Sequence, residues 1–152
     1  MQINRRGEPE CVTYEPAPLA KDHVRVRTVL SAISPGTEMT FYGRDASNVY
    51  LHKTWNEELR LFEPGQPSMQ YPITFGYRAA GVVVESRSSD VPVGHRVYGN
   101  WRHTELTAMP AERALEQALP DELTWDDGVD IGQMGPIALN AALFGGDEHV
   151  DR

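Results

Sequence analysis

The chain has little cysteine and no long apolar run, and each shortage excludes a class of protein. Cys11 is the only cysteine among 152 residues, which rules out an internal disulfide and a thiolate cluster around a structural zinc ion. No run of 18 apolar residues offers a membrane span. The N-terminal stretch "MQINRRGEPE" lacks the apolar centre of a secretion signal. We therefore expect a cytoplasmic protein with no membrane partner.

Basic residues are scarce in the last third of the chain. Residues 1–104 hold 12 basic and 11 acidic side chains, whereas residues 105–152 hold 2 basic and 11 acidic ones. An acidic surface repels phosphate backbones, so we expect no nucleic-acid partner. Charge runs of this kind usually form a solvated face that aids solubility.

Short strands are expected over much of the chain, separated by turns. Residues 22–32 alternate valine with polar or basic residues, which is typical of a strand with one wet face. Residues 79–85 read as a buried strand, and "HRVYG" and "HTELTAM" as two more. The stretch "SPGTE", which begins at Ser34, has the composition of a tight turn.

Two regions favour helices. Residues 49–62 place Leu51, Trp55, Leu59 and Phe62 at helical spacing, which predicts a short amphipathic helix packed on the strands. Residues 126–144 lose the alternation and gain alanine and leucine, which predicts a helix in two pieces, broken at residues 132–136. Strands followed by helices indicate a mainly β (α+β), barrel-like fold, and the length fits one domain.

Several motifs occur in an order that resembles a known domain. They are "VRVRTVLSAISPGTE", "FGYRAAGVVVE", "VGHRVYG" and "LPDELTWDDG" before an alanine-rich helix. This series resembles the N-terminal, GroES-like catalytic domain of the medium-chain dehydrogenase/reductase superfamily, the group of zinc-type alcohol dehydrogenases. "SAISPGTE" with "GY" is most similar to the zinc-lacking branch that contains bacteriochlorophyllide dehydrogenase and related oxidoreductases.

The resemblance implies a domain plan. Residues 1–146 would form a GroES-like, partly open β-barrel with the inserted helix and the C-terminal helices. Residues 147–152 would be a tail at the point where a Rossmann domain normally begins. No G-x-G-x-x-G motif occurs in the chain, so we expect the Rossmann domain to be absent from it.

The resemblance also bears on zinc. In zinc-dependent members the buried strand begins Gly-His-Glu, whereas here it begins Gly76, Tyr77 and Arg78. The cysteine ligand of those enzymes lies in the turn that here contains Ser34. A hydroxyl, a phenol and a guanidinium do not replace thiolate and imidazole on zinc. We therefore expect no metal site.

Three residues are candidates for catalysis by the resemblance. Tyr77 would donate a proton to a substrate oxygen or clamp it. Ser34 or Thr37 would hydrogen-bond to a substrate oxygen or to the cofactor ribose, with Thr37 the candidate for cofactor contact. The alternative is that Ser34 and Thr37 only cap the turn.

Three further residues are candidates for substrate binding. Arg78 suits a carboxylate or a phosphate, and its alternative role is an ion pair with Glu38 that joins two loops. Glu38 lies in the same turn as Thr37, and His103 lies in a region that commonly lines the cleft of the family. A histidine that is solvated or structurally hydrogen-bonded is the alternative for His103.

These expectations combine into a functional hypothesis with one alternative. The chain would be the catalytic, substrate-binding domain of a zinc-independent NAD(P)-dependent oxidoreductase, inactive until a Rossmann domain or chain supplies NAD(P). Apolar residues 134–146 would then meet a nucleotide-binding partner chain or a second copy of this chain. The alternative is a non-enzymatic GroES-like module that binds a ligand or a partner protein.

Overall fold

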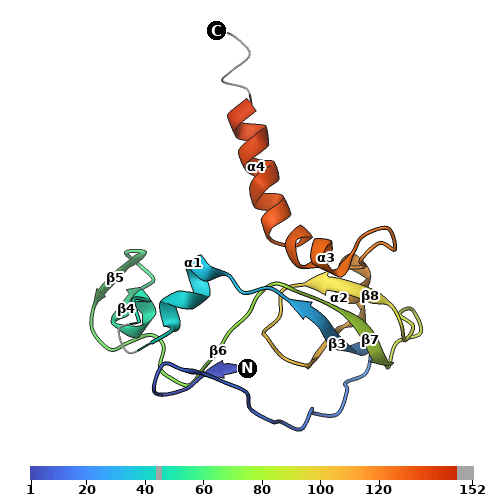
Figure 1. Ribbon diagram of the computed structural model, residues 1–152, viewed down its shortest axis with the longest axis horizontal. Helices are drawn as coiled ribbons and strands as arrows, with labels where there is room; N and C mark the ends of the chain where they lie inside the picture. The colour runs from blue at the N-terminus through green and yellow to red at the C-terminus, as the bar shows by residue number, and fades with distance from the viewer. Residues whose placement is uncertain (44–45, 147–152) are drawn as a thin grey trace. The chain divides into compact units, whose positions relative to one another are not determined.

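The computed structural model describes residues 1–43 and 46–146 (Figure 1). The chain divides into two compact units. Unit 1 contains residues 1–15 and 33–76, and unit 2 contains residues 16–32 and the chain from residue 77 onward. The expected tail at 147–152 lies outside the described residues.

Unit 2 is built on a four-stranded antiparallel sheet. Its strands are β3 (His23–Ser31), β7 (Ala79–Ser86), β8 (Arg96–Gly99) and β9 (Leu106–Pro110). They lie in the order β8-β7-β3-β9. Buried and exposed side chains alternate along β3 as predicted: Val24 and Val26 are fully buried, whereas Arg27 and Val29 are exposed. All four strands lie where the sequence predicted strands.

Glycine at position 81 permits the close pairing of β3 and β7. A methyl group there would overlap the backbone carbonyl of Arg27 on the neighbouring strand. The pairing of β3 and β7 is also irregular beside this point, between Thr28 and Leu30. The Gly-Val-Val motif therefore requires glycine at its first position, because the backbones of β3 and β7 come too close there for a side chain.

Helices follow the strands in unit 2; the last two of them were predicted, and the first was not. They are α2 (Ala111–Glu116), α3 (Trp125–Ile131) and α4 (Met134–Gly146). The break between the last two falls at residues 132–133, within the predicted interval, and Pro136 lies in the first turn of α4, where proline is tolerated. The core of the unit joins the sheet to α2 through Val24, Val83, Val97 and Ala114.

Unit 1 contains short elements around a small core. A three-stranded sheet has the order β2-β1-β6, with β1 (Gln2–Ile3), β2 (Pro9–Glu10) and β6 (Ile73–Thr74). The other elements are α1 (Pro35–Glu38), η1 (Met39–Phe41), η2 (Val49–Leu51), β4 (Lys53–Asn56) and β5 (Leu61–Pro64). Ile3, Phe41 and Ile73 form the buried cluster.

The prediction of a helix over residues 49–62 is wrong. Only η2 is helical there, and β4 and β5 form an antiparallel hairpin in which Trp55 pairs with Phe62. The two rings meet edge to face, with centroids 4.9 Å apart. Leu59, which a helix would bury beside Trp55, lies in the hairpin turn and is 57% exposed. The apolar spacing fits both structures, and cross-strand aromatic pairing fits only the hairpin.

The fold class is therefore mixed, with both strands and helices in unit 2. The strands of residues 1–43 and 46–146 form three separate sheets and no closed barrel. That arrangement is compatible with a partly open β domain. Within the same residues, no helix combines the length and the apolar character needed to cross a bilayer.

The hairpin predicts a modest role for Trp55. Because this side chain is only partly buried, Trp55→Ala should lower the free energy of unfolding by about 1 kcal/mol, the scale of one aromatic pair. A fully buried tryptophan would cost about 3–5 kcal/mol. Urea denaturation measures the difference, with Leu59→Ala as the matched control. Comparable losses of several kcal/mol for both variants would indicate a helix that buries both residues.

Candidate functional site

Tyr77 and Arg78 lie immediately before β7, where backbone contacts hold them in place. Gly76 precedes them with a φ of 112°, a conformation that favours glycine. The carbonyl of Arg78 accepts a hydrogen bond from the N–H of Ala32 at 3.0 Å. The backbone at the head of β7 is thus fixed against the end of β3.

The side chain of Arg78 pairs with Asp130 on α3. Its Nη1 donates to Oδ1 of Asp130 at 2.7 Å. The arginine side chain is only 14% exposed, whereas the aspartate side chain is 60% exposed. Nε of Arg78 is buried and has no hydrogen-bond partner among the described residues. The guanidinium is therefore largely shielded from water yet only partly satisfied.

A small hollow lies beside this pair. Tyr77 and Arg78 line it together with three amide residues, Asn100, Gln117 and Gln133. Its volume of about 30 Å³ suits about two water molecules, because one needs roughly 10–15 Å³ on this scale. The hydroxyl of Tyr77 makes no hydrogen bond with any residue in the described part of the chain. Tyr77 and Arg78 therefore share the lining of one small hollow.

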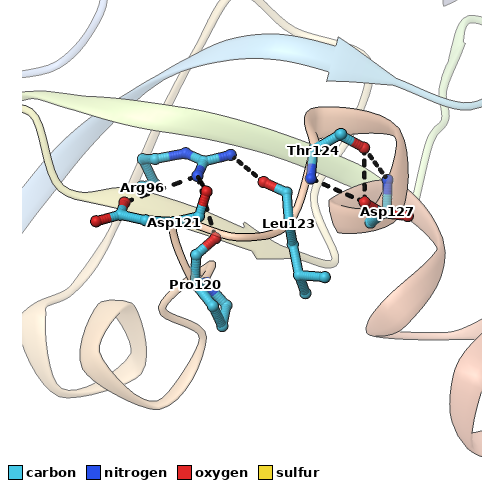
Figure 2. A network of polar contacts seen from close by, with 6 residues as sticks. All are labelled: Arg96, Pro120, Asp121, Leu123, Thr124 and Asp127. Carbon is cyan, nitrogen blue, oxygen red and sulfur yellow. Dashed lines mark hydrogen bonds and ion pairs between the residues drawn. The ribbon is translucent and has the colours of Figure 1, made fainter.

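Arg96 on β8 holds the loop that leads into α3 (Figure 2). Its guanidinium donates to the carbonyls of Pro120 at 3.1 Å, Asp121 at 3.2 Å and Leu123 at 2.6 Å. It also lies over the ring of Trp125, 4.4 Å from the centroid, in a cation–π contact. One side chain therefore fixes the start of α3 on the sheet.

A capping box completes this attachment. The N–H of Asp127 donates to Oγ1 of Thr124 at 3.2 Å, and the N–H of Thr124 donates to Oδ2 of Asp127 at 2.8 Å (Figure 2). The hydroxyl of Thr124 donates to the same carboxylate oxygen at 2.7 Å. These contacts satisfy N–H groups at the helix start and set the direction of the helix that carries Asp130.

The turn that contains Ser34 and Thr37 lies in unit 1, where it forms α1. The Ser34 side chain makes no capping hydrogen bond. Instead the carboxylate of Glu38 accepts from the N–H of Ser34 at 2.7 Å, and Glu38 is 3% exposed. Glu38 thus stabilises the turn, a role that the sequence did not reveal. Thr37 is exposed, and its carbonyl accepts from the hydroxyl of Thr40.

His103 lies in unit 2 and is buried. Its Nδ1 lies 2.9 Å from Oγ of Ser31, at the end of β3. Such a contact favours the structural alternative for His103.

The structure therefore brings together part of the predicted site. Tyr77 and Arg78 line one hollow in unit 2, whereas Ser34, Thr37 and Glu38 belong to unit 1. The ion pair between Arg78 and Glu38 stays a prediction. Asp130 was missed, because its carboxylate was read as part of a solvated acidic face. Because Asp130 lies four residues after Asp126 in a predicted helix, the sequence places both on the same side of that helix. The sequence does not indicate which residue Asp130 contacts.

The described residues contain no group of three or more histidine, cysteine or acidic side chains placed to hold a metal ion. The expected absence of zinc remains a prediction.

No family model matches the chain, and no curated protein shows significant sequence similarity to it.

The capping box predicts a specific acid response. The hydroxyl of Thr124, followed by its backbone N–H, lowers the pKa of Asp127 below its ordinary value. The stabilisation is present above the unfolded pKa of about 3.9 and is lost as pH falls through the lower folded pKa. Asp127→Asn should therefore flatten the fall in unfolding free energy below about pH 4. Urea midpoints between pH 2 and 6 measure this effect.

Asp126→Asn is the matched control for this prediction, because it removes the same charge from the same helical turn without touching the capping box. An equal flattening in both variants would contradict the assignment to the Thr124 contact.

Proposed function

We propose that the chain is the substrate-binding domain of a zinc-independent NAD(P)-dependent oxidoreductase of the medium-chain dehydrogenase/reductase type. The observation that supports it most is the pairing of Tyr77 and Arg78 at one hollow. By the resemblance, they correspond to the histidine and glutamate that follow glycine at the start of the same strand in zinc-dependent members of the superfamily. The ordered motifs and the antiparallel sheet are compatible with a GroES-like domain.

The cofactor itself does not fit the hollow. A nicotinamide ring is larger than a space for about two water molecules, and the whole dinucleotide is larger still. Nor does the sequence contain the glycine-rich turn that usually holds the dinucleotide phosphates. A separate nucleotide-binding domain or chain would therefore supply NAD(P).

The residues of this chain would bind and polarise the substrate. The hydroxyl of Tyr77, which lacks a partner among the described residues, would donate a hydrogen bond to a substrate oxygen. Arg78 would bind an anionic group of the same molecule and so orient it. Ser34 and Thr37 keep their proposed role toward a substrate oxygen or the cofactor ribose.

This function predicts an activity that depends on a second component. The isolated chain should not oxidise NADPH or NADH with a panel of ketones, aldehydes and keto acids. Fusion or mixing with a Rossmann domain of the superfamily should create turnover, which absorbance at 340 nm measures. In that assembly Tyr77→Phe should lower kcat by about 10²–10⁴-fold, with Tyr98→Phe on β8 as the matched control.

Turnover by the isolated chain would contradict the need for a second component. If no Rossmann partner ever creates turnover, the non-enzymatic binding module becomes the better account.

Apolar side chains on α4 support a partner for this domain. The helix has no charged residue. Its large exposed apolar residues are Ile137, Leu139, Leu143 and Phe144, which lie within the stretch 134–146 proposed to meet a partner. Phe144 is 82% exposed. An exposed apolar surface of this kind is normally covered by a partner, so α4 would provide a docking surface for a nucleotide-binding chain or for another copy.

The exposure of α4 predicts association in solution. Light scattering should give a mass above that of the 17.0 kDa monomer, or a stable complex with an added Rossmann domain. Replacing both Leu139 and Phe144 by Gln should restore a monomer, because it removes much of the exposed apolar area. Leu115→Gln on α2 is the control, since Leu115 is also exposed. A wild-type monomer that binds no Rossmann domain would contradict this role of α4.

A further inference from the structure

We propose that Arg78 is the binding site for a carboxylate group of the ligand, and that Asp130 competes with this carboxylate for the charge of the same guanidinium. The proposal rests on the proposed function and deepens it by naming the chemical class of substrate, a carboxylic acid. It depends on the donors of one guanidinium, the hollow beside it and the charge of one exposed aspartate.

Arg78 has more donors than the protein uses. A guanidinium carries five N–H groups, and Asp130 is the only side-chain partner of Arg78 among the described residues. Nε is buried from water and has no partner there. A buried donor without a partner is costly, so the guanidinium is incompletely satisfied by the protein, and a ligand would meet it through the part of the side chain that lines the hollow.

Space for that acceptor exists in the hollow lined by Arg78. The hollow accommodates about two water molecules by volume. The two oxygens of a carboxylate would take the places of two such waters. The amides of Asn100, Gln117 and Gln133, which also line the hollow, add uncharged groups that are able to donate. The rest of the ligand would remain outside.

Charge decides how the ligand enters. Arg78 and Asp130 neutralise each other, so a second carboxylate beside the intact pair would leave a net negative charge at a largely buried place. The ligand must therefore displace Asp130. That displacement is feasible because the Asp130 side chain is 60% exposed and can turn into water.

Carboxylate fits better than phosphate because the protein already shows the interaction. Asp130 presents a carboxylate oxygen to Nη1 at 2.7 Å, a charge-assisted distance. A free carboxylate can reproduce that contact and also take a second, parallel hydrogen bond from the planar guanidinium. A phosphate has the same bidentate chemistry with a bulkier head, which the small hollow disfavours.

The test uses acetate as the probe and the Arg78 side chain as the reporter. Acetate is titrated into the full chain at constant ionic strength, and the Nε–H signal of Arg78 is followed by 15N NMR. Asp130→Asn keeps the shape of the competitor and removes its charge. It should bind acetate about fivefold more tightly than the wild type, the scale of one solvent-exposed ion pair. Asp126→Asn, with the same change of net charge, should match the wild type.

Three outcomes would overturn the proposal. The first is an equal gain in Asp126→Asn and Asp130→Asn, which would reflect net charge alone. The second is acetate binding that persists in Arg78→Gln, followed there by calorimetry, which would place the ion elsewhere. The third is inorganic phosphate binding as tightly as acetate, which would remove the carboxylate assignment. If Asp130→Asn does not fold, the wild type still decides, because acetate must shift its Arg78 Nε–H signal.

The experiment also separates this proposal from the proposed function. Acetate binding is measured without NAD(P) and without turnover, so its failure leaves the oxidoreductase proposal in place. Intact acetate binding without turnover in any Rossmann assembly would instead reject the oxidoreductase activity and keep the carboxylate site.

Discussion

The attachment of α3 to the sheet through Arg96 is the constraint on which the candidate site depends. Three backbone carbonyls between Pro120 and Leu123 lie within hydrogen-bond distance of this one side chain. A charged donor that serves several loop carbonyls at once stabilises one loop path over others. Trp125 then covers the guanidinium, and α3 starts from a fixed point.

Two fixed points therefore meet at the ion pair between Arg78 and Asp130. The backbone of Arg78 is held by its hydrogen bond to Ala32 at the end of β3. Asp130 is held by α3, whose start is fixed by Arg96 and whose direction is set by Thr124. Neither partner has to order a loop in order to form the pair, so little conformational entropy is lost in making it. The pair is preorganised, although its acidic member remains in contact with water.

Local sequence patterns predicted the sheet of unit 2 correctly and the hairpin of unit 1 wrongly. The difference lies in whether the spacing of apolar residues fits one type of secondary structure or two. Along β3 the alternation of valine with basic residues has only one interpretation. The spacing of Trp55, Leu59 and Phe62 fits both a helix and a hairpin, and cross-strand contacts decide between them. Arg78 was recognised as a candidate from its place in a motif. Asp130 was not, because pairing over 52 residues leaves no local signal.

The hollow and the exposed helix are connected through the chain itself. Gly132 and Gln133 form the break between α3 and α4, and both residues line the hollow. A side chain at position 132 would press on the ring of Tyr98, so this break leaves little room for change. A partner that covers α4 would therefore bind next in the chain to one wall of the hollow that Arg78 lines.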